Sequence, residues 1–112
     1  MLTKEEMEQV AERFIQKLGN ESGIEMILSD ELGGKPYGNV YHFESKEYIL
    51  TGDPGKALVG NGLFMVEKKT GRVVVFGTAL HLEDYLTAYE KGILIEAKGR
   101  YWYPEEDRYD SK

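Results

Sequence analysis

Cysteine is absent from this chain of 112 residues. The protein can therefore form neither a disulfide framework nor a thiolate zinc site. Histidine is nearly as scarce, at two residues, which leaves few groups for a metal cluster or for the general base of an enzyme. No apolar run reaches the length of a signal peptide or of a membrane span. We therefore expect a soluble cytoplasmic protein.

The sequence contains fewer basic than acidic residues. Twenty acidic residues outnumber fourteen Lys and Arg residues, which gives a net charge of -6 at pH 7. Such a charge repels nucleic acid and anionic membranes and favours basic partners. The composition argues against binding to nucleic acid or to a membrane.

The length is that of one domain, which can bury about two thirds of the surface of the unfolded chain. We place this domain at residues 1–104. The sequence beyond Pro104 is charged, so residues 105–112 are expected to form a loose acidic tail.

The first segment has the pattern of an amphipathic helix. Thr3 is the expected N-cap, and Glu6 three residues later completes a capping box. Gly19 and Asn20 are expected to end the helix. Its apolar residues recur at spacings of three and four, which predicts one face packed on a sheet: Met7, Val10, Ala11, Phe14, Ile15 and Leu18.

After the first helix the apolar residues alternate with polar ones, which predicts strands. The glycine-rich stretch 31–38 is expected to be an irregular loop. Residues 39–45 and 47–51 are expected to pair as one hairpin. Residues 63–68 and 72–77 are expected to pair as another, with Gly71 left-handed in the connection. A further strand is predicted at residues 23–29.

A second helix is predicted from about His81 to Lys91, and Gly92 is expected to stop it. Four apolar residues share one face of this helix: Leu82, Tyr85, Leu86 and Tyr89. In the tail, Ile93 and Ile95 could open a strand, Lys98-Gly99 could turn it, and Tyr101 to Tyr103 could pair back. The expected fold class is α+β: one domain, with an N-terminal helix packed on an antiparallel sheet of about five strands and a second helix near the C-terminus.

Residues 52–62, GDPGKALVGNG, contain four glycines and a lysine. A phosphate-binding Walker loop needs Ser or Thr after Gly-Lys and a glycine upstream. Here Ala57 follows Lys56, and Leu50 occupies the upstream position. The stretch is therefore interpreted as turn scaffolding, in which Gly60 and Gly62 adopt positive φ angles. A loop that contacts a ligand is the competing interpretation.

A series of motifs runs through residues 37–91, beginning with the aromatic segment Val40 to Tyr48 and Thr51-Gly52-Asp53. It continues with Ala57-Leu58-Val59-Gly60-Asn61-Gly62, Phe64, Val66, Thr70-Gly71-Arg72-Val73, Gly77-Thr78-Ala79, and Glu83-Asp84-Tyr85-Leu86 with Tyr89. Together these motifs resemble the immunity protein 35 family, or YrhB-like domain, of bacterial polymorphic toxin systems. Leu63 and His81 depart from the family pattern by standing where it has proline. Other residues can replace proline at such turn and first-turn positions.

The resemblance implies a function in binding. Such domains are encoded beside bacterial toxins, bind the cognate toxin in the cytoplasm and block it. We therefore expect an immunity protein without catalytic activity, cofactor or metal, whose partner is a toxin domain of basic charge. The alternative is a chaperone-like or stress protein of the same domain type that binds unfolded clients. Homodimerisation through an exposed strand edge also remains open.

A third hypothesis is a small hydrolase that uses His81, one of the two histidines. His42 lies in an expected strand whose neighbours Tyr41 and Phe43 face the other way, so a surface or packing role is favoured. His81 lies beside Glu83 and Asp84 at the start of the second helix, as a near-cap residue. Metal binding there stays open, although the spacing is not the i, i+4 pair that places two ligands on one helical face.

Eight tyrosines and one tryptophan exceed what a small core requires, and such side chains dominate protein interfaces. Tyr85 and Tyr89 are expected to be structural. The candidate partner-binding residues are Tyr37, Tyr101, Trp102, Tyr103, Glu105, Glu106 and Asp107. In this hypothesis Trp102→Ala loses protection while folding is retained. The alternative is a terminal strand in which Trp102 is buried.

Overall fold

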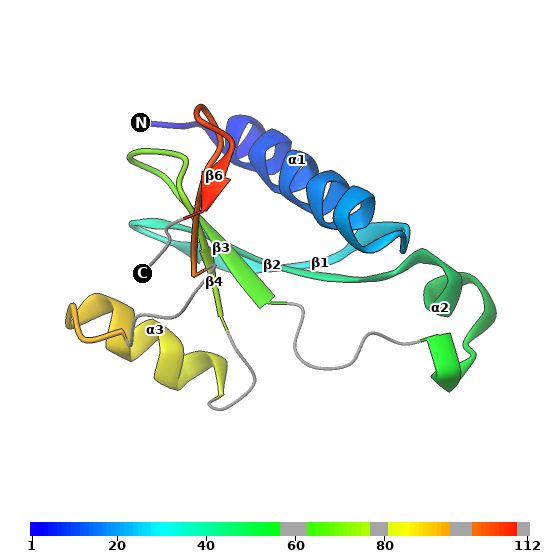
Figure 1. Cartoon of the computed structure of the whole chain (residues 1–112). Coiled ribbons are helices and arrows are strands. Elements are labelled where there is room, and N and C mark those ends of the chain that lie inside the picture. The colour runs from blue at the N-terminus through cyan, green and yellow to red at the C-terminus, as the bar shows by residue number, and fades with distance from the viewer. Residues whose placement is uncertain (57–62, 77–80, 95–99, 110–112) are drawn as a thin grey trace.

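Six antiparallel strands form one meander in the part of the chain that the structure describes, residues 1–56, 63–76, 81–94 and 100–109. In this computed structural model each strand pairs with the strand that follows it in sequence (Figure 1). The elements are α1 (Lys4–Ser22), β1 (Met26–Lys35), β2 (Gly38–Ser45), α2 (Lys46–Thr51), the 3₁₀ turn η1 (Pro54–Lys56), β3 (Leu63–Glu67), β4 (Val73–Val75), α3 (Leu82–Glu90), β5 (Tyr101–Tyr103) and β6 (Arg108–Tyr109).

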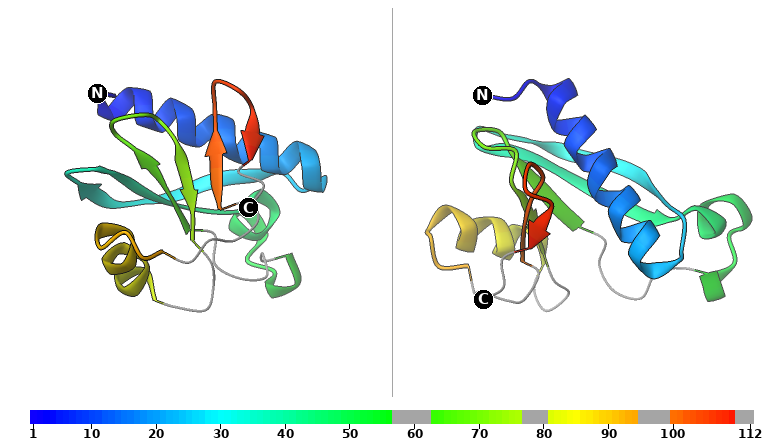
Figure 2. Two further views of the ribbon diagram at one scale, coloured as in Figure 1. Left: turned by 60° about the vertical axis from the view of Figure 1, so that its left-hand side comes forward. Right: turned by 45° about the horizontal axis from the view of Figure 1, so that its top comes forward.

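The helices α1 and α3 cover opposite faces of the sheet (Figure 2). Side chains alternate between these faces along β3, which is buried throughout. Phe64 and Val66 pack in the cluster that contains the apolar face of α1, whereas Met65 packs with Tyr85 and Leu86 of α3. The predicted α+β fold is confirmed, with six strands among the described residues rather than about five.

Helix α1 begins as predicted and ends later. Thr3 accepts a hydrogen bond from the backbone of Glu6, and the Glu6 carboxylate accepts one from the Thr3 backbone. The predicted end at Gly19 is wrong, because the helix continues to Ser22 and is capped by Gly23 in the left-handed conformation. Gly19 serves close packing instead: a Cβ there would lie 3.1 Å from the carbonyl oxygen of Ile24.

The stretch 31–38, predicted to be irregular, belongs largely to the β1–β2 hairpin. Lys35 pairs with Gly38, so only Pro36 and Tyr37 connect the two strands. Gly33 and Gly34 pair with Val40 and Asn39, and the ladder is irregular between Leu28 and Asp30 and between Glu31 and Gly33. Such bulges keep an edge strand paired while bending it, which is why glycine content alone mispredicted this segment.

Residues 47–51, predicted to be a strand, form the short helix α2. Ser45 is its N-cap, with a side chain that accepts a hydrogen bond from the Tyr48 backbone, and Gly52 ends it at φ 70°. Capping at both ends outweighed the β propensity of the aromatic and β-branched residues between them.

The β3–β4 hairpin and helix α3 agree with the predictions. Gly71 has φ 76° in the hairpin connection, and Tyr85 and Leu86 are buried on the apolar face of α3. The expected conformations of Gly60 and Gly62 lie outside the described residues.

The C-terminal segment is more ordered than predicted. Residues 105–107 form a turn and Arg108–Tyr109 pairs with β5, where a loose tail was expected; residues 110–112 lie outside the described residues. Tyr101–Tyr103 does form a strand, which pairs with β4. No strand begins at Ile93, and Ile95 with the predicted turn at Lys98-Gly99 lies outside the described residues.

Helices that could cross a membrane are not found in the described ranges, where none is both long enough and apolar enough.

Candidate functional site

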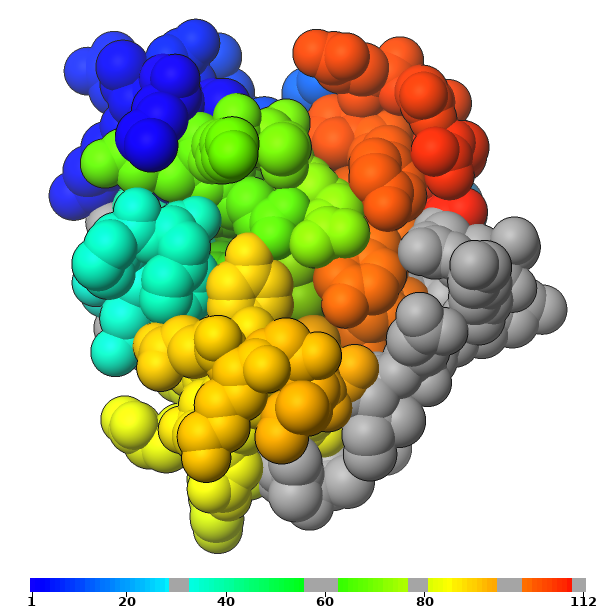
Figure 3. All heavy atoms as spheres, turned by 90° about the vertical axis from the view of Figure 1, so that its left-hand side faces the viewer, coloured from blue at the N-terminus to red at the C-terminus, as the bar shows by residue number. Residues whose placement is uncertain are grey.

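A groove of about 550 Å³ lies where several chain segments meet at one end of the sheet. Figure 3 shows this face, with the β1–β2 turn in cyan, the β3–β4 connection in green, the end of α3 in gold and β5 in orange. The lining residues are Met1, Pro36, Tyr37, Glu67, Lys68, Lys69, Thr70, Arg72, Tyr89 and Tyr103. Four of them carry charged side chains, and three are tyrosines.

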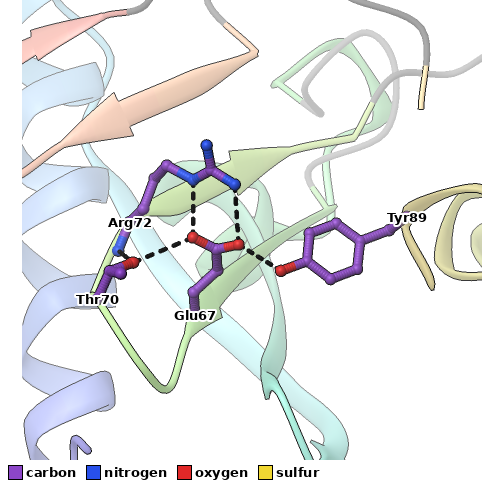
Figure 4. Close-up of polar contacts among 4 residues, drawn as sticks. All are labelled: Glu67, Thr70, Arg72 and Tyr89. Atoms are coloured by element: carbon purple, nitrogen blue, oxygen red, sulfur yellow. Dashed lines mark hydrogen bonds and ion pairs between the residues drawn. The ribbon is translucent and has the colours of Figure 1, made fainter. Parts of the chain in front are cut away.

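Glu67, the last residue of β3, is the polar centre of the groove wall. Its side chain is only 10% exposed. The Arg72 guanidinium makes a bidentate interaction with the Glu67 carboxylate: Nε donates to Oε1 at 2.7 Å and Nη2 donates to Oε2 at 2.9 Å. Thr70 donates to Oε1 at 3.1 Å and the Tyr89 hydroxyl donates to Oε2 (Figure 4). Glu67 thus joins the hairpin connection to α3.

The turn that follows β3 explains how these side chains meet. The amide of Glu67 donates to the carbonyl of Arg72 at 2.9 Å, and the amide of Gly71 donates to the carbonyl of Glu67 at 2.8 Å. These bonds close a tight connection that places Arg72 beside Glu67, with Gly71 supplying the left-handed residue.

The surroundings of Glu67 determine its ionisation. Burial alone would raise its pKa, but the hydrogen bonds from Arg72 and Tyr89 and the charge of Arg72 outweigh burial, so the pKa lies below its usual value. At neutral pH the carboxylate is ionised and its charge is balanced by the guanidinium. Because four donated hydrogen bonds occupy its two oxygens, Glu67 is arranged to hold structure rather than to accept a proton from a substrate.

Tyrosine rings form the walls around this pair. The guanidinium of Arg72 lies 4.1 Å from the ring centroid of Tyr101 and 6.0 Å from that of Tyr103. The rings of Tyr37 and Tyr89 are 5.0 Å apart. Cation–π and ring–ring contacts of this kind fix the side chains in place, so the groove presents ordered aromatic surface.

Two of the tyrosine hydroxyls in the groove donate hydrogen bonds to carboxylates of the protein. Tyr37 donates to Oε2 of Glu90 at 2.6 Å, and Tyr89 donates to Glu67. Burial, together with the neighbouring carboxylates, raises the pKa of both tyrosines. Both hydroxyls therefore stay protonated at neutral pH and act as hydrogen-bonding groups.

The structure brings some of the predicted partner-binding residues together. Tyr37 and Tyr103, which lie far apart in the sequence, both line the groove. Tyr101 lies behind them against Arg72 and packs on the α3 side of the core. Glu105 and Glu106 are exposed and line a smaller hollow that shares Thr70, Arg72 and Tyr103 with the groove.

The remaining predicted residues, Trp102 and Asp107, lie elsewhere. Trp102 is 2% exposed and packs against Phe14, with ring centroids 5.6 Å apart. Its assignment to a partner-binding surface is therefore wrong. Asp107 accepts a hydrogen bond from Nε1 of Trp102 at 3.1 Å and pairs with Lys17 of α1 at 3.0 Å, which gives it a structural role at the β5–β6 turn.

Sequence reasoning missed Glu67 and Arg72 as parts of a site, and it assigned Tyr89 to the core alone. Tyr89 does pack partly against the α3 side of the core, but its hydroxyl also reaches Glu67. The missed signal is the pair of opposite charges on either side of Thr70-Gly71, because a tight hairpin brings such residues face to face.

The histidines lie away from the groove. Tyr41 and Phe43 both pack on the α1 side, which agrees with the predicted alternation around His42. His81 is the exposed N-cap residue of α3 and makes no capping hydrogen bond through its side chain. Within the described ranges no cluster of three or more His, Cys, Asp or Glu residues is placed to hold a metal ion.

Comparison with known proteins gives one partial likeness. The chain is 44% identical over 48 residues to the uncharacterized protein YrhB of Escherichia coli (strain K12). That stretch is 43% of this chain and 51% of YrhB, so the chain spans about half the length of this relative. No protein-family model and no solved structure matches the chain. The likeness is one of sequence, and it assigns no activity to this chain.

Proposed function

We propose that the protein is a cytoplasmic immunity protein that binds and neutralises a cognate bacterial toxin domain of basic charge, without catalysing a reaction. The observation that carries the proposal is the groove wall of ordered tyrosines around the Glu67–Arg72 pair. Aromatic side chains whose rotamers are already fixed lose little entropy on binding, and Tyr and Arg are enriched at interface hot spots. The motif resemblance to immunity proteins supplies the class of partner.

The chemistry of the groove favours binding over catalysis. Its buried carboxylate is saturated by Arg72, Thr70 and Tyr89, and two of its tyrosines are held as protonated donors. A nucleophile paired with a base is the usual sign of an enzyme of the hydrolase class. The groove-lining residues offer hydrogen bonds and aromatic area instead.

The test is binding to the toxin domain encoded beside this gene. We expect the purified proteins to form a nanomolar complex by calorimetry and co-expression to protect cells. Tyr37→Ala and Tyr103→Ala should each weaken the complex about thirtyfold, the size of a hot-spot loss of about 2 kcal/mol. Tyr48→Ala is the matched control, because Tyr48 is also half-buried but lies on α2, away from the groove.

Absence of a complex with the neighbouring toxin, together with no protection of the cells, would refute the proposed function. If all three tyrosine substitutions weaken the complex equally, with folding verified by circular dichroism, the groove is not the part of the surface that binds the toxin. Trp102→Ala is unsuitable here: truncating a tryptophan in the core costs about 3–5 kcal/mol, so lost protection would report unfolding.

A second candidate is a chaperone-like protein, and one observation favours it. Ile24, Ile49 and Leu50 are apolar yet 45%, 47% and 72% exposed, and exposed apolar side chains can hold unfolded clients weakly. Suppressed aggregation of several unrelated unfolded proteins, without a tight complex with the neighbouring toxin, would select this function over the first.

A further inference from the structure

We infer that the groove binds an acidic segment of the partner protein, with an apolar or aromatic side chain seated against the tyrosine rings and flanking carboxylates paired with Lys68 and Lys69. The inference rests on the proposed function in taking a protein as the ligand. It adds where that protein is held and which chemistry its contacting segment must have.

The local charge of the groove is opposite to that of the molecule. Lys68, Lys69 and Arg72 line it together with one carboxylate, Glu67, whereas the chain as a whole carries -6. Because Arg72 and Glu67 neutralise each other, Lys68 and Lys69 are the remaining charged side chains among the lining residues, while the neighbouring Glu90 carboxylate is held by the Tyr37 hydroxyl. Opposite potentials are what complementary interfaces bring together, so this charge selects a partner segment with carboxylates.

Lys68 and Lys69 differ from Lys17 and Lys46, whose ammonium groups have carboxylate partners among the described residues. Lys17 pairs with Asp107 at 3.0 Å and Lys46 with Glu25 at 3.1 Å. The ammonium groups of Lys68 and Lys69 make no ion pair or hydrogen bond with any described residue. Their charges are therefore available to a ligand without breaking an existing contact.

The backbone beneath these lysines is fixed. The amide of Lys68 donates to the carbonyl of Tyr37 at 2.8 Å, and the amide of Leu2 donates to the carbonyl of Lys68 at 2.7 Å. The β3–β4 connection is thus tied to the β1–β2 turn and to the segment before α1. Such preorganisation lowers the entropy lost on binding.

The groove floor suits an apolar side chain better than a small anion. Pro36 and the rings of Tyr37, Tyr89 and Tyr103 supply apolar surface, and a volume of about 550 Å³ is in the range of pockets that enclose small organic groups. A phosphate site would need converging backbone amides. Here the amides of Lys68, Gly71 and Arg72 already donate within the protein.

The experiment selects random peptides displayed on phage against the intact protein and then titrates a labelled peptide of the resulting consensus. We expect the consensus to contain an aromatic or large aliphatic residue flanked by Asp or Glu. The double variant Lys68→Glu/Lys69→Glu should weaken this peptide about tenfold or more, because each attraction becomes a repulsion. Lys46→Glu, a single charge reversal on α2 away from the groove, should alter the affinity less than about twofold.

Contradicting outcomes are a basic consensus, no enrichment over an unrelated protein, or equal losses in the groove and control variants. Competition by inorganic phosphate at concentrations near the peptide affinity would also overturn the inference in favour of a small-anion site. The inference and the proposed function fail separately. If the toxin binds but the NMR chemical shifts of the groove residues do not change, only the inference is refuted. If acidic peptides bind the groove but the protein does not protect cells from the toxin, only the proposed function is refuted.

Discussion

At the scale of single residues, Glu67 is the side chain on which the groove wall depends. It carries a buried negative charge that is matched by Arg72 and hydrogen-bonded by Thr70 and Tyr89. Removing one member of such a group leaves the others desolvated without a partner, which costs more than the net strength of the original bonds.

Glu67→Gln is predicted to lower the free energy of unfolding by about 1–3 kcal/mol. The amide keeps the shape of the side chain but removes the charge opposite Arg72. Urea unfolding followed by fluorescence measures the change. Glu105→Gln makes the same substitution at an exposed position, and its free energy of unfolding should stay within about 0.5 kcal/mol of that of the parent. Equal stability of the two variants would mean that the pair contributes nothing.

The same comparison has a defined pH dependence. The pKa of Glu67 is lowered in the folded state, so its ionised form stabilises the fold at pH values above its unfolded pKa of about 4.3. This contribution decreases as the pH falls through the folded pKa. The stability difference between the parent and Glu67→Gln should therefore be full at pH 7 and shrink below about pH 4.

Residue-level features could be predicted from sequence where the partners are close along the chain. The capping box of Thr3 and Glu6 was correct because three residues separate its members. The contact of Tyr89 with Glu67 spans 22 residues and depends on how α3 lies on the sheet. Trp102 was ambiguous because a strand has two faces, and sequence alone did not show which face the helix covers.

At the scale of elements, the β5–β6 turn is fastened to α1 by polar contacts. Arg13 donates to the carbonyl of Pro104 at 3.1 Å, and Lys17 pairs with Asp107 at 3.0 Å. Asp107 also accepts from the Trp102 indole and has a positive φ of 45°. Asp tolerates this left-handed conformation better than most residues, so one residue both shapes the turn and attaches it to the helix.

Asp107→Ala is predicted to loosen β6 without unfolding the sheet. Alanine removes the acceptor for Trp102, the partner of Lys17 and the tolerance for positive φ. Amide hydrogen exchange in Arg108 and Tyr109 should therefore accelerate, while exchange in β3 stays as in the parent. Asp107→Asn keeps the acceptor and the backbone tolerance, so it should lie between alanine and the parent. Unchanged exchange in the alanine variant would show that the contacts do not hold the turn.

Element predictions succeeded where periodicity and end signals agreed. The β3–β4 hairpin and α3 both had apolar patterns bounded by glycine. The segment 47–51 had β-favouring residues between two helix-capping residues, and its length of one to two turns left periodicity uninformative. The second half of β1 was mispredicted in the opposite direction, because pairing with β2 supplied a regular structure that its glycines do not favour locally. Its first residues, from Met26, fall within the strand predicted at 23–29.

At the scale of the whole molecule, the uneven charge affects how a partner approaches. The net charge of -6 acts over roughly a Debye length, about 8 Å in physiological salt, whereas Lys68 and Lys69 act on groups in direct contact. A basic toxin domain would thus be attracted by the overall field, and an acidic segment on that domain would fit the groove.

The rate of association with the toxin domain is therefore predicted to fall steeply as salt is added. Electrostatic steering raises association rates well above the neutral range of about 10⁵–10⁶ M⁻¹s⁻¹, and screening removes this gain. Stopped-flow measurements from low to high salt should show the association rate falling more than tenfold, with dissociation changing much less. An association rate that does not depend on salt would argue against a basic partner.

The fold class was within reach of sequence reasoning because it follows from two amphipathic helices and several alternating segments. The placement of α1 and α3 on opposite faces was not, since both helices show only that one side is apolar. The groove depends on this placement, because α3 contributes Tyr89 and the sheet contributes Glu67. A site assembled from separate layers has no signature in any one stretch of sequence.

The packing of Phe14 against Trp102 has a consequence for synthesis on the ribosome. The hairpins β1–β2 and β3–β4 join neighbours in sequence and can form as soon as each emerges. The apolar side of α1 cannot be fully covered until the residues around position 102 have also left the exit tunnel. For most of its translation the nascent chain therefore carries an incompletely covered helix face, which is the state in which a chaperone would meet it.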